Sequence, residues 1–321
     1  MAIVLFRLTL AVAAGLSVAA SAWAGPYSGH SNDSGNAFDP PIAASDSQFI
    51  GWATSVVQYL PAPGVMGNDD ASQTLGSPDG VTVSLGDLFE VGVNEPPDDG
   101  SVLPFDLRDP WSGDANDLAD DYGFVGIDGP GSITVGFDVP IVNISGFDFA
   151  VFENGFGHAF ASEVTHQDYI FAELGHVEVS SDGVNFVRFP SVSTHVETDL
   201  DTEYGREFAA LDPTNVLHLA GKHAFGWATQ FDLAVLESDP LVTGSQVDLD
   251  GVNFVRIVDI VGNGSVLDAS SNGIFDSWVG VNTGGFDLDA VGVLPEPATC
   301  LIFVFNAALL VIGRQWRSER T

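Results

Sequence analysis

The sequence predicts an all-β fold, an antiparallel β-sandwich of the jelly-roll kind, and three observations support this prediction. Short segments rich in Val, Ile and Phe recur along the chain, and Gly, Asp, Asn or Pro separates most of them. The 36 glycines suit the many tight turns of such a fold. The long apolar-periodic segments that a helical α/β fold needs are missing from the same region. Frequent short strands with turn signals are typical of antiparallel sandwiches.

We expect this domain to span residues 45–293. Its predicted strands are rich in β-branched and aromatic residues, which suit a pleated surface. They are 81–85, 133–139, 144–152, 176–180, 185–189, 246–249, 254–261 and 286–293.

One short helix is expected at the start of the domain. Ser45 or Asp46 can cap its first turn, and Pro61 ends it. Apolar residues follow helical spacing in between, at Phe49, Trp52, Ala53, Val56, Val57 and Leu60.

Two segments differ in composition from the predicted strands. Residues 25–44 are rich in Gly, Ser, Asn, Asp and Pro and predict a flexible lead-in. Residues 86–122 are acidic and predict a long loop inserted in the sandwich. Trp111 lies in this insertion, where its ring could stack on a sugar.

The heptapeptide Asp-Gly-Val-Asn-Phe-Val-Arg occurs twice, at 182–188 and at 250–256. Each copy predicts a β-hairpin around its Asp-Gly turn. Asp182 and Asp250 could offer carboxylates to a ligand from two equivalent turns, or could serve the turns alone. The flanking sequences differ, which favours shared turn chemistry over duplication of a whole domain.

The charge balance limits the partners of the chain. It has 44 Asp and Glu against 9 Lys and Arg, a formal net charge of −35. Such a surface repels nucleic acid and attracts cations. The 45% of hydrophobic residues, with 23 Phe, still allow a sizeable core. The one cysteine, Cys300, lies in the apolar C-terminal segment, so no disulfide is expected in the domain.

Both ends of the chain predict sorting segments. Residues 1–24 have a lone Arg7, an apolar stretch and a small-x-small site before Gly25, which favours a cleaved signal peptide over a membrane anchor. Residues 294–321 combine a Pro-Glu-Pro motif with an apolar run at 298–313 and a basic tail. The motif and tail residues singled out are Pro295, Glu296, Pro297, Arg314 and Arg317. We expect this run to enter the membrane as a helix, rather than to be an ordinary buried helix.

This C-terminal arrangement resembles the PEP-CTERM signal that bacterial exosortases recognise and cleave. The resemblance implies that the chain is exported, transiently anchored in the membrane and processed by an exosortase. It also implies that the mature protein resides at the cell surface or in the extracellular matrix.

An ordered set of segments resembles a β-sandwich domain of secreted bacterial proteins, and 177–186 is similar to a hairpin of discoidin-like, galactose-binding-type jelly rolls. The set is 75–80, 83–86, 131–137, 149–153, 177–183, 231–233 and 285–291. The resemblance implies an extracellular module and no particular reaction.

Four carboxylates embedded in strands are candidate metal ligands. Asp287 and Asp289 are two residues apart, so both side chains leave one face of a strand. Glu153 and Asp232 also lie among apolar strand residues. Adjacent carboxylates repel one another unless a cation or hydrogen-bond donors lie between them, and hard oxygen ligands suit Ca²⁺. The alternative is that these acids face solvent or bond to backbone N–H groups in turns.

These observations predict a structural or adhesive surface protein, stabilised by Ca²⁺, and not an enzyme. The sequence contains no nucleophile elbow and no phosphate-binding loop. The alternative is a carbohydrate-binding module that holds an extracellular polysaccharide or another envelope component. A hydrolase on the same scaffold is a third possibility, to which chance pairs of carboxylates give little support.

Overall fold

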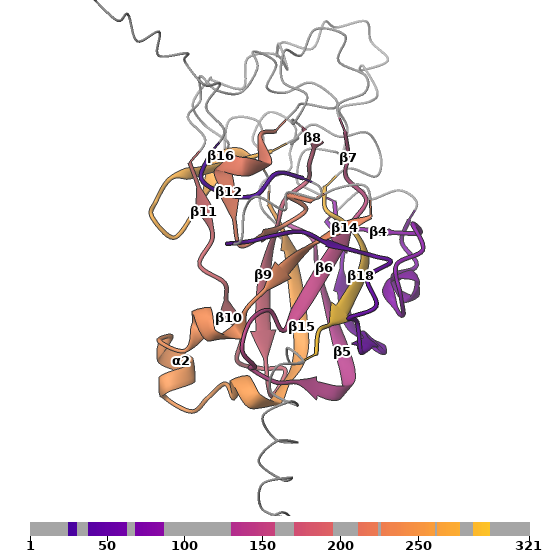
Figure 1. Cartoon of the computed structure of the whole chain (residues 1–321), viewed down its shortest axis with the longest axis vertical. Helices are drawn as coiled ribbons and strands as arrows, with labels where there is room; N and C mark the ends of the chain where they lie inside the picture. Colours follow the sequence, from indigo (N-terminus) through magenta and orange to yellow (C-terminus); the bar gives the residue numbers. More distant parts are fainter. Residues whose placement is uncertain are drawn as a thin grey trace, which may run out of the picture.

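The computed structural model is mostly β, with antiparallel curled sheets and few helices (Figure 1), consistent with the β-sandwich expected from the sequence. The predicted signal peptide, acidic insertion and sorting segment lie outside the residues that it describes, except for Gly86, Leu294 and Pro295. The described ranges are 25–30, 38–62, 68–86, 130–157, 170–194, 211–223, 226–260, 262–276 and 285–295.

Two six-stranded sheets form the body. The order in the first sheet is β1 (Ile42–Ala43), β14 (Trp227–Phe231), β6 (Phe149–Glu153), β18 (Asp287–Val293) and β2 (Gly51–Trp52), and β4 (Val83–Ser84) also pairs with β18. The order in the second sheet is β10 (Val187–Arg188), β9 (Gly175–Ser180), β15 (Val252–Asp259), β5 (Ser132–Ile141) and β3 (Ser55–Leu60), and β13 (Leu219–Ala220) also pairs with β9.

Shorter elements connect the two sheets. The small two-stranded sheets are β7 (Phe156–Gly157) with β8 (Ile170–Phe171), β11 (Val192–Ser193) with β12 (Val216–Leu217), and β16 (Asn263–Leu267) with β17 (Gly273–Phe275). The described helical turns are η1 (Ala71–Thr74), η3 (Pro213–Asn215), η4 (Leu233–Leu236), α2 (Pro240–Thr243) and η5 (Leu249–Gly251).

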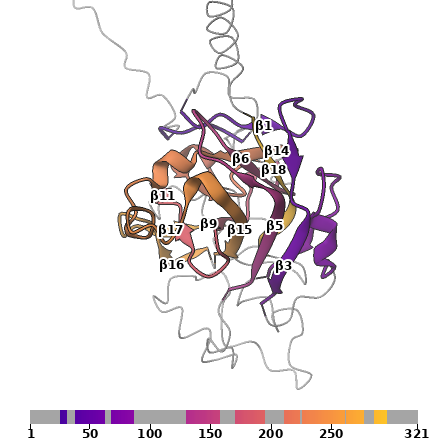
Figure 2. The same cartoon turned by 90° about the horizontal axis from the view of Figure 1, so that it is seen from below.

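The main hydrophobic core lies between the two sheets, which form separate layers in Figure 2. Alternate residues of each strand point into it, because successive side chains of a strand leave opposite faces. Val177 and Val179 of β9 and Ile257 of β15 share this core with Phe149 and Val151 of β6. Each such side chain contributes about 1.5–3 kcal/mol when it is fully buried.

The helix predicted between residues 49 and 60 is wrong, because this segment forms β2 and the edge strand β3. A register shift between Val56 and Gln58, where β3 pairs with β5, breaks the period-2 alternation of the strand. Ala53, Val56 and Tyr59 therefore all pack on the main core at three-residue intervals, which imitates a helical pattern.

The two heptapeptide copies have different structures but pack on each other. The first forms the turn between β9 and β10, as expected. The second begins in η5 and continues into β15, so its predicted hairpin is wrong. Arg188 and Arg256 end the two copies, and both bond to Glu178 on the strand between them. The Arg256 guanidinium also lies 3.8 Å from the centre of the Phe186 ring.

We expect Glu178→Gln to lower the free energy of unfolding by about 1–2 kcal/mol, because one carboxylate serves two arginines. The loss stays modest since both guanidinium groups reach solvent. Urea denaturation measures this loss of unfolding free energy, with Glu237→Gln on the exposed surface as the control. Equal transition midpoints for both variants would show that the Glu178 carboxylate does not stabilise the fold.

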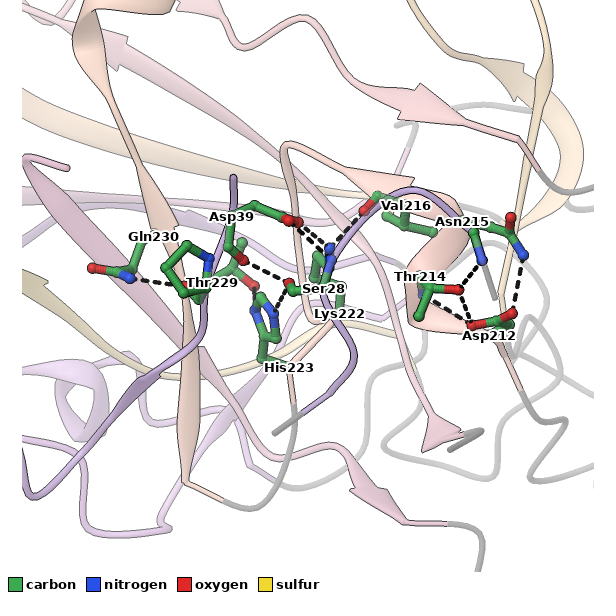
Figure 3. A network of polar contacts seen from close by, with 12 residues as sticks. Ser28, Asp39, Asp212, Thr214, Asn215, Val216, Lys222, His223, Thr229 and Gln230 are labelled. Carbon is green, nitrogen blue, oxygen red and sulfur yellow. Dashed lines mark hydrogen bonds and ion pairs between the residues drawn. The ribbon is translucent and has the colours of Figure 1, made fainter. Parts of the chain in front are cut away.

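The segment expected to be a flexible lead-in is packed on the body where it is described (Figure 3). Ser28 and Asp39 are buried, and β1 pairs with β14. Asp39 forms an ion pair with Lys222, and the Ser28 hydroxyl contacts the ring of His223 at 3.0 Å. Ser28 and Asp39 therefore satisfy buried partners here instead of facing water.

Candidate cation site

Five buried carboxyl side chains lie where strands of the two sheets end, near enough for their charges to interact, and we call them the acidic cluster. Glu153 ends β6 and Asp287 begins the neighbouring strand β18. Asp259 ends β15 in the second sheet, and Glu173 lies two residues before β9 begins. Asp276 follows β17 directly. None of the five is more than 6% exposed.

Hydrogen bonds fix the direction of four of these side chains. The backbone N–H of Gly155 donates to Glu153 Oε2 at 2.7 Å, and that of Leu174 donates to Asp276 Oδ2 at 2.8 Å. The backbone N–H of Phe286 donates to Asp259 Oδ1 at 2.8 Å. The Asn154 amide donates to Asp287 Oδ2 at 2.8 Å. Each of these four carboxyl groups is therefore anchored through one of its two oxygens.

Three oxygens of the acidic cluster are buried without a hydrogen-bond partner among the described residues. They are Glu153 Oε1, Glu173 Oε1 and Asp287 Oδ1. Buried polar atoms are nearly always paired, because an unpaired one costs about 1–3 kcal/mol. These three oxygens are therefore the positions at which a further donor or a bound cation would find acceptors.

Burial and mutual repulsion both disfavour the charged form of these groups. Burial raises the pKa of Asp287 to about 6 and that of Asp276 to about 8. Burial, and then repulsion from Asp287, holds the pKa of Glu153 well above its usual range. Burial also raises the pKa of Glu173, which is further raised by repulsion from each of the other four members. Glu173 is thus the member whose pKa is raised by all four of the others.

The described Lys and Arg residues form ion pairs with other carboxylates. Arg188 and Arg256 bond to Glu178, and Lys222 pairs with Asp39. These three are the Lys and Arg residues of the described ranges. A bound cation would reverse the repulsion between the carboxylates.

The donor set suits a hard divalent cation. Ca²⁺ takes six to eight oxygen ligands in flexible geometry, and carboxylates are its usual protein ligands. Within the described residues, no group of three or more His, Cys, Asp or Glu side chains is arranged to hold a metal ion. The side chains of the acidic cluster would therefore have to draw together around an ion.

The structure brings together two of the four metal ligands expected from the sequence, Glu153 and Asp287. Asp289 lies at a register shift in β18 and instead accepts the N–H groups of Asp79 and Gly80. Asp232 caps η4 by accepting the N–H of Ala234.

Sequence reasoning missed Glu173, Asp259 and Asp276. Each is a single acid inside an apolar run, which is the signal that singled out Glu153. Applied to the whole chain, that signal would also have found these three.

The other candidate residues are not part of the acidic cluster. The Asp182 carboxylate accepts the N–H groups of Val184 and Asn185, and so stabilises its own turn. Asp250 is exposed in η5. Trp111, Glu296, Pro297, Arg314 and Arg317 lie outside the described residues.

No helix in the described part of the chain is long and apolar enough to span a membrane. No protein-family model matches the chain, and a search of curated proteins finds no match to it.

Proposed function

We propose that the chain is an exported, non-enzymatic protein of the cell surface or extracellular matrix with a structural or adhesive role. Its β-sandwich, of the jelly-roll kind, is stabilised by Ca²⁺ bound at the acidic cluster. The observation that carries this proposal is the set of unpartnered buried oxygens on Glu153, Glu173 and Asp287.

A cation at this position would join the two sheets. Glu153 and Asp287 belong to the first sheet, whereas Asp259 and Glu173 belong to or adjoin the second. An ion held by both groups ties the layers together at one end of the sandwich. Mg²⁺ is less suitable because it requires near-ideal octahedral geometry and gives up water reluctantly.

Export and processing are supported by the two ends of the sequence. The small-x-small site before Gly25 favours removal of residues 1–24. The motif that begins at Pro295 resembles an exosortase signal, so the exosortase and, transiently, the membrane are the proposed partners. The strongly acidic composition suits an extracellular setting, where millimolar-range Ca²⁺ sites are common.

Calorimetric titration of Ca²⁺ into chelator-treated protein, recovered from cells that express the full chain, tests the proposal. We expect saturable heat and a higher melting temperature with Ca²⁺. A ligand at 100 times its Kd adds about 2.7 kcal/mol to the free energy of unfolding. Mg²⁺ at the same concentration serves as the control, with a smaller effect. Absence of both heat and thermal stabilisation with Ca²⁺ would refute the proposal.

A further inference from the structure

The first described residues are bound to a turn far along the chain. Gly25 donates its N–H to Thr214 Oγ1, and Tyr27 donates its N–H to the Thr214 carbonyl oxygen at 3.0 Å. The Thr214 hydroxyl in turn donates to Asp212 Oδ1 at 2.6 Å. A relay therefore links the backbone nitrogen of Gly25 to a carboxylate, and Figure 3 shows its Thr214–Asp212 portion.

Oxygen acceptors surround position 25. A Cβ atom built on Gly25 would overlap the Thr214 carbonyl oxygen and lie 2.6 Å from Asn215 Oδ1. Asp212 is 5% exposed, and within the described part of the chain it forms no ion pair with Lys or Arg. This turn, residues 212–215, thus has negative charge, several acceptors and room for a glycine only.

The chain that follows Gly25 is fixed as well. Ser28 donates its N–H to Asp39 Oδ1 at 2.9 Å and its hydroxyl to the Asp39 carbonyl at 2.6 Å. Asp39 also pairs with Lys222, which is fully buried. Gln230 donates to the Pro40 carbonyl at 2.7 Å. These contacts hold the nitrogen of Gly25 against the turn at 212–215.

We propose that the turn at 212–215 is a binding site for the α-ammonium group of Gly25, which forms when the peptide bond between Ala24 and Gly25 is hydrolysed. A signal peptidase adds water across that bond, so that Ala24 gains a carboxylate and Gly25 an ammonium group. Before cleavage this nitrogen carries one N–H and no charge. Afterwards it carries three N–H donors and a positive charge beside Asp212.

Charge-assisted hydrogen bonds are roughly twice as strong as neutral ones, so cleavage strengthens this contact. Capture of a chain's amino terminus by fixed acceptors is a known mode of recognition. Removal of the leader thus completes the fold of the mature chain. This inference rests on the proposed export and cleavage of the chain, but not on Ca²⁺ binding.

The sequence allows an unusually clean test. It contains one lysine, Lys222, which is buried in its ion pair with Asp39. The α-amine is therefore the accessible primary amine of the processed chain. The full chain is expressed in an exporting host, and the processed protein is sequenced from its amino terminus. It is then treated with a limiting amine-acylating reagent near neutral pH and analysed by mass spectrometry.

We expect the processed protein to begin at Gly25-Pro26-Tyr27. Its α-amine should be acylated at least about tenfold more slowly than that of the free peptide Gly-Pro-Tyr, because charge-assisted bonds occupy it. The acylated protein should melt at a lower temperature. A different first residue, or labelling as fast as the free peptide, would overturn the inference.

Variants separate the site from general stability. Asp212→Asn and Thr214→Val should bring the labelling rate close to that of the peptide, whereas Thr214→Ser, which keeps the hydroxyl, should not. Asp250→Asn on the exposed surface is the control and should label like the native protein. Protection of Lys222 in each variant reports that the fold is intact. Unchanged protection of Gly25 in folded Asp212→Asn and Thr214→Val would also overturn the inference.

Discussion

Replacement of Lys222 by methionine is expected to lower the free energy of unfolding by about 3–5 kcal/mol. The Lys222 ammonium group is buried, pairs with Asp39 and donates to the Val216 carbonyl at 2.7 Å. Methionine keeps the length and apolar stem of the side chain but removes the charge. The substitution thus leaves the buried Asp39 carboxylate without its counter-charge, although Ser28 still donates to it.

Urea denaturation of the protein measures this loss through the transition midpoint. The matched control is the double variant Lys222→Met with Asp39→Asn, which removes both charges. Since replacing both partners of a buried pair is often near neutral, the double variant should recover much of the stability. A single variant as stable as the native protein would mean that the ion pair does not hold the amino-terminal segment on the sandwich.

Replacement of Glu173 by glutamine is expected to weaken Ca²⁺ binding by about 100-fold, because an anionic oxygen ligand becomes a neutral amide. Glu173 is the member of the acidic cluster whose charge is repelled by all four others. Its loss should therefore leave the Ca²⁺-free protein no less stable than the native one, since repulsion between buried carboxylates falls. A variant that binds Ca²⁺ more weakly, but is as stable as the native protein when Ca²⁺ is absent, has lost a side chain that coordinates the ion.

Calorimetry and thermal melting with and without Ca²⁺ measure both parts of this prediction. Asp232→Asn is the matched control, because Asp232 is a strand-flanking acid that caps η4 and lies outside the acidic cluster. It should bind Ca²⁺ with native affinity. Equal losses of Ca²⁺ affinity in both variants would assign the effect to overall charge instead of to the acidic cluster.

Much of the fold could be predicted from the sequence, because strand patterns are local. The segments 133–139, 176–180 and 286–293 fall largely within β5, β9 and β18. The helix expected near residue 53 failed because a register shift in the β3–β5 pairing gives core-facing residues a three-residue spacing. Such a shift depends on the neighbouring strand, which a local pattern does not contain.

Only two members of the acidic cluster, Glu153 and Asp287, could be predicted from the sequence, for a similar reason. Glu153 and Asp287 stand out as acids in apolar strands, and the pairing of β6 with β18 brings them together. Glu173, Asp259 and Asp276 have the same local setting, but only the topology places them near these two. The two-residue strand period predicts that Asp289 lies on the same face as Asp287. A register shift in β18 instead directs the Asp289 carboxylate to the backbone N–H groups of Asp79 and Gly80.

The packed amino-terminal segment also depends on tertiary contacts. Its Gly, Ser, Asp and Pro residues have the composition of a linker. The same residue types supply the contacts that bury it: Ser28 and Asp39 bond to each other and reach His223 and Lys222. Composition alone does not distinguish polar groups that face water from polar groups that find partners.

Ca²⁺ binding at the acidic cluster can be observed in a crystal structure of the protein grown with Ca²⁺. We expect density for an ion bound by Glu153 Oε1, Glu173 Oε1 and Asp287 Oδ1 at about 2.3–2.6 Å, the typical range for Ca²⁺–oxygen ligands. An ion-free cluster at saturating Ca²⁺, with its carboxyl groups bonded to one another or to an arginine, would contradict it.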